Sequence, residues 1–532
     1  MAGAAQFFSG AAVLTAAVAL SKVLGALYKI PLGNLLGSTG MAHFYAAYNI
    51  FNLLLLLSTA GLSVAVSRLT STAEVQGRCG QMRRILRTAL LLFTAIGLVG
   101  SAVMLLFPQV LANLLHDAPA AAAIRVLAPS VLCICVVCAV RGYTQGLGNM
   151  RPTAVSQILE SAVKLTVGLF LCRYLLQRNA APHVAAAGAI AGVTAGSVLS
   201  LCYMLRTLRH CPLPPAFDTP LSRRATARQI LSIGIPITLG SAGMSLITLL
   251  DQSLTLGTLQ HTLGYTAQDA SALYGQYTFA LTLFTLPCSF IYPVSAALMP
   301  ALAGASARRD TRAAVSLTDS ALRLTALLSF PMGLGMSVLA EPLLLLLYPA
   351  VPETARAAAA HLKILGLASI FVCLMAVTSG ILQACGKERL PLVTLLCGGA
   401  LKILTNYLMV SQPEIHIGGA AVSTLYCYAL ITLLNIIAVG RTVASVDFFR
   451  LFWRPGLAAV LMAMAAGSGY RFLQGRLPDT PAVLLTVLAA AAVYAALALA
   501  LGAVTPAELR CLLPQRKTAS CRTSRPHGSS LR

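Results

Sequence analysis

The chain has 532 residues, of which 58% are hydrophobic and only 10% are charged, and its mean hydropathy is +0.81. A soluble globular domain carries about 25% charged residues, so this composition excludes a soluble enzyme. Apolar runs of about 20 residues, the length at which a helix crosses a bilayer, recur along the whole chain. We therefore predict an all-α, polytopic membrane protein.

Fourteen membrane-spanning helices are predicted in chain order. Their centres lie near residues 18, 55, 96, 132, 165, 196, 243, 288, 330, 370, 401, 429, 462 and 492. The first is expected to stay in the mature protein, because Met1 to Gly10 has no basic start and no cleavage site typical of a signal peptide.

The formal net charge of +23 reflects 38 Lys and Arg against 15 Asp and Glu. Most basic residues, including Arg141, fall in one set of alternate connections and in the C-terminal tail. The other connections hold only a few, namely Arg173, Arg178, Arg356, Arg471 and Arg476. Because basic loops stay on the cytoplasmic side, both termini are predicted to be cytoplasmic. The excess charge then indicates topology, not nucleic-acid binding.

An internal repeat indicates how the helices are grouped. Ala121–Leu171 aligns with Ala359–Met409, a shift that places Lys164 on Lys402 and the loop motif GxxQxxGxxR on a second copy. A parallel repeat of this kind is typical of transporters with two lobes. The predicted units are an N-terminal six-helix lobe (1–210), a cytoplasmic linker (211–228), a C-terminal six-helix lobe (229–445), two extra spans (446–505) and a disordered basic tail (506–532).

Ionisable residues within the predicted spans are the candidate site. An ionised side chain at the bilayer centre costs at least about 2.5 to 3.5 kcal/mol, so each should face a partner or a wet cavity. The balance is positive, which favours an anion such as a phosphate or pyrophosphate. The basic candidates are Lys22, Lys29, Arg68, Lys164 and Lys402, and the acidic ones are Glu160 and Asp251.

Several of these residues have alternative interpretations that the sequence leaves open. Glu160 precedes Lys164 by four residues and could pair with it on one helix face. Lys402 has no such acid, because Gly398 replaces it, and needs another partner. Lys29 could extend to the membrane surface, and Arg68 could serve as an interfacial anchor. Asp251 could neutralise a lysine or carry a coupling proton, as Glu160 could in an exporter.

Two segments resemble a known family. They are Ser21–Leu32 (SKVLGALYKIPL) and Thr59–Arg68 (TAGLSVAVSR). Both are similar to the stage V sporulation protein B group of the multidrug/oligosaccharidyl-lipid/polysaccharide flippase superfamily, which is related to MurJ-type lipid II flippases. The resemblance implies a V-shaped bundle whose cavity is lined by basic residues of the first two spans, here Lys22, Lys29 and, more loosely, Arg68.

We therefore hypothesise a flippase that moves a polyprenyl-pyrophosphate-linked saccharide, such as the peptidoglycan precursor lipid II, by alternating access. The alternatives are a cation-coupled multidrug exporter and, below it, a membrane glycosyltransferase or polymerase. For a transporter we expect no catalytic residue and no cofactor. We also expect no metal, because the C-x-x-C spacing of Cys135 and Cys138 lacks the further ligands that zinc needs. The expected partners are the lipid-linked oligosaccharide, membrane lipids and cell-wall synthesis proteins, with the chain acting as a monomer.

Overall fold

The computed structural model describes residues 2–210, 218–308, 310–443 and 447–503, and the regular elements of these ranges are helices. The predicted tail (506–532) and most of the predicted linker lie outside the described residues. The helices of the N-terminal half are α1 (Ala2–Val75), α2 (Cys79–Leu106), α3 (Pro108–Leu114), the 3₁₀ turn η1 (Ala118–Ala120), α4 (Ala121–Gly146), α5 (Arg151–Gln177) and α6 (Pro182–Arg209). Those of the C-terminal half are α7 (Arg223–His261), α8 (Ala267–Phe284), α9 (Leu286–Ala307), α10 (Thr311–Val338), α11 (Ala340–Leu347), α12 (Pro352–Ala384), α13 (Arg389–Val410), α14 (Gly418–Thr442), α15 (Phe448–Leu473) and α16 (Asp479–Ala500).

The all-helical membrane fold is confirmed. Eleven described helices, or twelve if the bent α7 is counted as a span, are long and apolar enough to cross a membrane. All fourteen predicted centres lie within helices. The number of crossings and the cytoplasmic placement of the termini stay predictions. The segment predicted as one span near residue 288 is divided at Thr285, because Pro287 in the first turn of α9 has no N–H to continue the preceding helix.

The long helix α1 is divided at Gly37. Its backbone there has a φ of 64° and a ψ of −168°, in a region open to glycine. In a straight helix, Lys29 and Tyr45 would lie about 24 Å apart. Their side chains are instead hydrogen bonded at 3.0 Å, so the chain turns back on itself at Gly37. The two predicted spans near 18 and 55 are the two arms of this hairpin.

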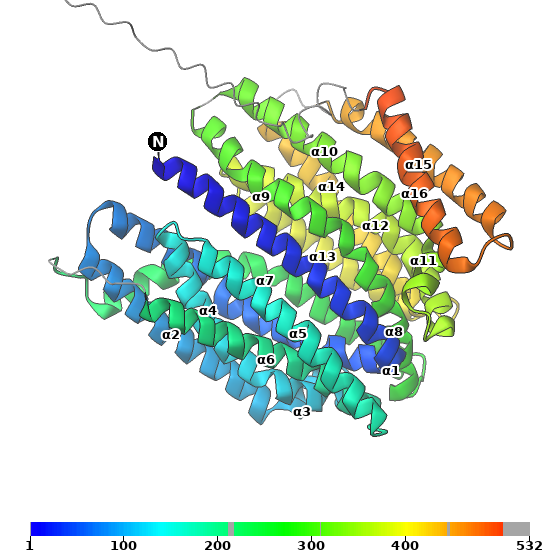
Figure 1. Ribbon diagram of the computed structural model, residues 1–532, viewed down its shortest axis with the longest axis horizontal. Coiled ribbons are helices and arrows are strands. Elements are labelled where there is room, and N and C mark those ends of the chain that lie inside the picture. The colour runs from blue at the N-terminus through cyan, green and yellow to red at the C-terminus, as the bar shows by residue number, and fades with distance from the viewer. Residues whose placement is uncertain (1, 211–217, 309, 444–446, 504–532) are drawn as a thin grey trace, which may run out of the picture.

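The helices form two groups. In Figure 1, α2, α4, α5 and α6 lie together, α10, α12, α14, α15 and α16 lie together, and the first arm of α1 runs between them. Helix α1 packs against α4 and α5 of the first group and against α7 and α8 of the C-terminal half. Helix α15 packs on α10 and α16 packs on α15, so these two helices extend the second group at its edge.

The repeat is also present in the backbone. The α4–α5 turn and the α12–α13 turn have matching ends, with α5 and α13 beginning at the aligned residues Arg151 and Arg389. Gly148 and Gly386 have φ values of 70° and 75°. In each turn the glycine N–H donates to the carbonyl three residues earlier, at 2.9 and 3.0 Å. This agreement supports an origin of the two lobes by duplication, whereas the exact domain boundaries stay predictions.

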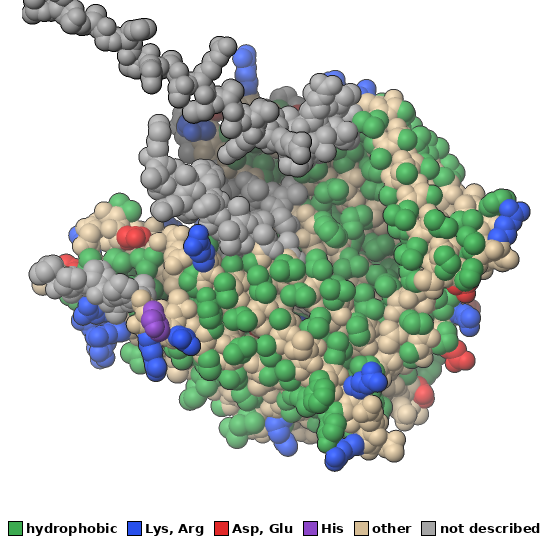
Figure 2. Space-filling model, in the orientation of Figure 1, with side chains coloured by type: hydrophobic (Ala, Val, Ile, Leu, Met, Phe, Trp, Pro, Cys, Tyr) green, Lys and Arg blue, Asp and Glu red, His purple; other side chains and the backbone are tan. Residues whose placement is uncertain are grey.

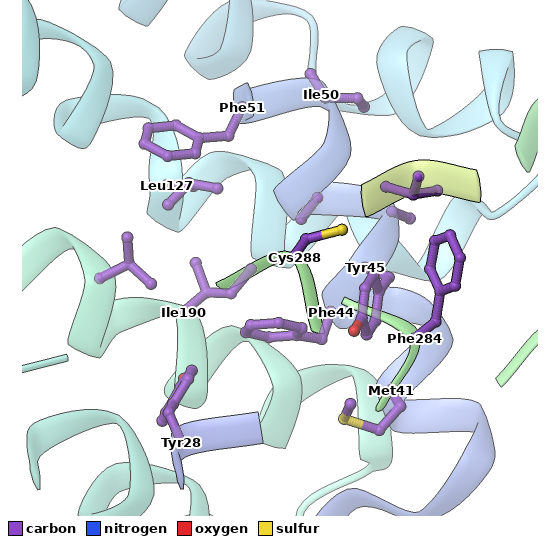
Figure 3. Packing of buried hydrophobic residues seen from close by; sticks show 14 of the residues in the cluster. Tyr28, Met41, Phe44, Tyr45, Ile50, Phe51, Leu127, Ile190, Phe284 and Cys288 are labelled. Atoms are coloured by element: carbon purple, nitrogen blue, oxygen red, sulfur yellow. The ribbon is translucent and has the colours of Figure 1, made fainter. Parts of the chain in front are cut away.

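The distribution of side chains suits a bilayer. Figure 2 shows an apolar surface across the molecule, with most Lys and Arg side chains near the edges of the view. The core contains buried aromatic rings of both arms of α1. Figure 3 shows Tyr28 beside Phe44, with Tyr45 next to them. The ring centroids of Tyr28 and Phe44 are 5.9 Å apart, and those of Phe44 and Tyr45 are 6.0 Å apart. The hairpin of α1 is therefore fixed by packing at the boundary between the two lobes.

Candidate functional site

Three lysines of the predicted site lie near Tyr48, and Lys164 contacts it directly. Lys164 Nζ, on α5, donates to the hydroxyl of Tyr48 at 3.3 Å. The same Nζ lies 4.7 Å from the ring centroid of Tyr48 and 5.2 Å from that of Tyr28. Lys22, Lys29 and Lys164 all lie within electrostatic range of Tyr48. The fold thus brings together basic residues of both the first span and α5.

The tyrosines are held by contacts that leave their rings facing the lysines. The hydroxyl of Tyr28 donates to the carbonyl of Ala189 on α6 at 2.8 Å. Gly168 of α5 permits this arrangement, because a Cβ there would lie 2.8 Å from the Tyr28 hydroxyl. A lysine ammonium over an aromatic face gains a favourable cation–π interaction. Lys164 is therefore positioned without a carboxylate.

Lys29 connects the cluster to the other lobe. Its Nζ donates to the hydroxyl of Tyr45 and lies 4.6 Å from the centroid of that ring. The Tyr45 hydroxyl lies 3.0 Å from Thr282 Oγ1 on α8. One turn further along α1, Asn49 donates to Gln252 of α7 at 2.7 Å. The lysine cluster is thus at the boundary across which the two lobes would move.

The cluster is electropositive. Lys29 and Lys164 are half-buried and Lys22 is exposed. Among the described residues, none of the three forms an ion pair with an acid. Half-buried ammonium groups without acidic partners attract anions, and their hydrogen-bond donors suit phosphate oxygens. We refer to Lys22, Lys29 and Lys164 as the lysine cluster.

Lys402 has a different environment. Its Nζ lies 2.9 Å from Asp251 Oδ2 on α7, and both side chains are buried. Asn406, one turn further along α13, donates to the other carboxylate oxygen of Asp251 and to Thr255 Oγ1. Of the two roles that the sequence left open for Asp251, the structure places it as the partner of a lysine. Lys402 is neutralised within its own lobe and is not gathered with the lysine cluster.

Glu160 contacts Arg141, whereas the sequence suggested Lys164 as its partner. Arg141 NH2 lies 3.1 Å from Glu160 Oε2, and the guanidinium also donates to Ser156 and Ser200. The prediction that Arg141 lies in a cytoplasmic connection is wrong: it is inside α4 and 8% exposed. The rule for basic loops misplaced Arg141 because a half-buried acid on the neighbouring helix, Glu160, stabilises its charge.

Arg68 is exposed on the second arm of α1, about 30 Å along the helix from Tyr48 at 1.5 Å per residue. The structure does not bring it to the lysine cluster. The sequence analysis did not predict the tyrosines that contact the lysines. Tyr45 and Tyr48 are three residues apart, a spacing that places both on one side of a helix. Their role depends on the hairpin at Gly37, which no local motif reveals.

A second contact between the lobes lies on the side predicted to face outward. His43 Nδ1 of α1 lies 2.7 Å from Asp117 Oδ1, and both residues are buried. The same connection is held from α7, where Ser253 donates to the carbonyl of Leu114 at 2.6 Å and Gln260 donates to that of His116 at 2.7 Å. We call Leu114–Asp117 the outer clasp, because it contacts the first lobe through Asp117 and α7 through its carbonyls.

The chain is similar to known protein families over most of its length. The family model described as "Polysaccharide biosynthesis protein" matches residues 7–306, and the MatE model matches residues 269–408. Stage V sporulation protein B of Bacillus subtilis is 25% identical over 441 residues, which cover 82% of this chain and 84% of the relative. Lipid II flippase MurJ of the same organism is 24% identical over 478 residues, covering 86% and 87%.

Solved structures have the same fold. Lipid II flippase MurJ in an inward closed conformation matches with a TM-score of 0.66 at 15% identity, covering 91% of this chain and 97% of that one. An inward-facing multidrug resistance MATE family transporter matches with a TM-score of 0.65 at 14% identity, covering 82% and 98%. At these identities the likeness concerns the fold, and residue roles must come from this chain's own geometry.

Proposed function

This chain belongs to the polysaccharide biosynthesis protein family, and we propose that it is a flippase for a polyprenyl-pyrophosphate-linked saccharide, a cell-wall precursor such as lipid II. The proposed direction is from the inner to the outer leaflet of the bacterial plasma membrane. Its relatives include proteins named as a lipid II flippase and as a sporulation protein. The proposal concerns transport, without covalent chemistry.

The lysine cluster is the observation that carries this proposal. A pyrophosphate diester is a dianion, and Lys22, Lys29 and Lys164 offer ammonium groups without an acidic partner among the described residues. Charge-assisted hydrogen bonds of this kind are the strongest that a side chain makes with phosphate. The half-buried position of Lys29 and Lys164 reduces the screening of that attraction by water.

In the proposed cycle, the pyrophosphate enters the space between the lobes and replaces the tyrosine hydroxyls as acceptor for Lys29 and Lys164. Loss of the Lys29–Tyr45 contact frees Tyr45 from its position beside Thr282, so binding is coupled to the lobe boundary. Rocking of one lobe against the other then carries the headgroup across. We propose that Arg68 attracts the substrate at the cytoplasmic end.

The remaining charges receive supporting roles. Lys402 is held by Asp251, and Arg141 is held by Glu160, so both pairs compensate charge inside their lobes. We propose that Lys402 contributes to the substrate only if its pair with Asp251 opens during the cycle. The chain is proposed to act as a monomer among membrane lipids and near the cell-wall synthesis proteins that supply and consume the precursor.

A cation-coupled multidrug exporter is the second candidate, favoured by the match of the MatE model and by the buried Asp251. An exporter of organic cations needs an acidic side chain that is available to bind the transported cation. Asp251 already holds an ammonium group at 2.9 Å, and Glu160 holds a guanidinium at 3.1 Å. This occupancy supports the flippase over the exporter.

A depletion experiment tests the proposal. The resident lipid II flippase of a bacterial host is depleted while this chain is expressed, and growth is followed. Rescue is expected with the unaltered chain and not with Lys164→Met. In a second arm, the same cells are exposed to cationic drugs, and an increased resistance without rescue of growth would favour the exporter.

A further inference from the structure

A second anion site lies away from the lysine cluster, where α6 ends. A cavity of about 560 Å³ opens between the α4–α5 turn and the last two turns of α6. Helix α6 contributes Tyr203, Arg206 and Thr207, and His210, which caps its C-terminus, continues the same face. The turn contributes Leu147 and Asn149 among others.

The cavity is built for an anion. The lining residues include a basic side chain, Arg206, and no Asp or Glu. Arg206 is exposed and forms no ion pair with a described residue. Asn149 accepts the backbone N–H of Arg151 through Oδ1, which leaves its amide N–H groups available to a ligand. A guanidinium and an amide that line one hollow are donors that match phosphate oxygens.

The surroundings favour a lipid over a soluble anion. Leu147 and the ring of Tyr203 form apolar walls of the cavity. Two turns before Arg206, on the same face of α6, Leu199 is 42% exposed. Helix α6 is a candidate membrane span that ends at Arg209, so the cavity lies at the level of a headgroup. An acyl chain along Leu199 would continue from a phosphate at Arg206 on the same helix face.

We propose that this cavity binds the phosphodiester headgroup of an anionic glycerophospholipid such as phosphatidylglycerol, with Arg206 as its main contact. Basic cavities between helices on the cytoplasmic side of a membrane protein suit such headgroups. Bound there, the lipid bridges α6 and the α4–α5 turn. The site is separate from the lysine cluster and does not depend on the transported substrate.

Binding is measured on the full purified chain by native mass spectrometry, by adding dioleoyl phosphatidylglycerol, dioleoyl phosphatidylcholine or inorganic phosphate. One charge-assisted hydrogen bond contributes about 1.5 to 3 kcal/mol, so Arg206→Gln should weaken the most tightly bound phosphatidylglycerol by about tenfold or more. Arg209→Gln is the matched control, because Arg209 is exposed in the same helical turn and does not line the cavity. Phosphatidylcholine is expected to bind more weakly.

A second variant separates a loss of lipid binding from a loss of folding. Leu147→Trp fills the cavity while retaining Arg206, and it should also reduce phosphatidylglycerol binding, with the melting temperature in lipid-free detergent recorded for each variant. Equal losses for Arg206→Gln and Arg209→Gln would overturn the proposal, since they would indicate attraction by surface charge alone. Full displacement of the lipid by inorganic phosphate would also overturn it, because the site would then hold a soluble anion. Growth rescue by Arg206→Gln has no bearing on the lipid site, so the two proposals fail separately.

Discussion

Lys164 and Lys402 occupy equivalent positions in the two lobes, yet within the described part of the chain only Lys402 has a carboxylate partner. Asp251 lies 2.9 Å from Lys402, whereas Lys164 is held by the hydroxyl of Tyr48 and two aromatic faces. The equivalent lysine positions are therefore neutral in one lobe and positive in the other. This asymmetry leaves the positive lobe available for an anion.

The Lys402–Asp251 pair should behave as a structural unit. Removing one member of a buried ion pair strands the other charge and costs about 3 to 5 kcal/mol, whereas replacing both by neutral residues is often tolerated. We expect Lys402→Met and Asp251→Asn each to lower the melting temperature markedly. The double variant should recover most of the loss in thermal unfolding of the purified protein. A Lys402→Met protein of unaltered stability that no longer flips substrate would indicate instead that Lys402 is a ligand.

Tyr48 should orient Lys164 without supplying the charge that binds substrate. Tyr48→Phe removes one hydrogen bond, a loss of about 0.5 to 1.5 kcal/mol, and keeps the ring below the ammonium group. Affinity for an undecaprenyl-pyrophosphate saccharide, measured by microscale thermophoresis, should fall by no more than about tenfold. Lys164→Met should reduce it further, and Lys164→Arg should retain part of it. A greater loss for Tyr48→Phe than for Lys164→Met would contradict this order.

The outer clasp should depend on Gln260. Its amide donates to the His116 carbonyl, so Gln260→Ala is expected to raise the hydrogen-exchange rate of the backbone amides of 115–117 by about tenfold or less, the effect of one neutral hydrogen bond. Gln109→Ala is the control, because the hydrogen bond of exposed Gln109 lies within α3, to Asn113. Unchanged exchange in Gln260→Ala would show that the clasp is held by other contacts.

Acidification should loosen the same segment. Partial burial lowers the pKa of His116 below its usual value, and the nearby His261 lowers it further. The unfolded chain then binds more protons than the folded chain, so stability is present above the ordinary histidine pKa of about 6.5 and falls as the pH drops below it. Hydrogen exchange of 115–117, corrected for its intrinsic pH dependence, should increase between pH 7 and pH 5. In His116→Asn, which suits the φ of 55° at this position, the increase should disappear.

Much of the fold can be predicted from the sequence because helices and turns are specified by residues close together in the chain. Hydropathy locates the helices, and the GxxQxxGxxR motif marks two turns that the structure closes in the same way around Gly148 and Gly386. Pairing between distant segments is not local. Asp251 reaches Lys402 from a helix in another part of the chain, and Arg141 was misplaced because its partner Glu160 becomes a neighbour only after α4 and α5 pack.

The most direct test is a flipping assay in proteoliposomes that contain a fluorescent undecaprenyl-pyrophosphate saccharide, with dithionite quenching to report the outer leaflet. The unaltered chain should translocate the lipid. Lys22→Met, Lys29→Met and Lys164→Met should each slow it by about tenfold or more, while Lys387→Met, an exposed lysine outside the cluster, should not. Translocation at the unaltered rate by the triple variant of Lys22, Lys29 and Lys164 would contradict the assignment of this cluster to the pyrophosphate.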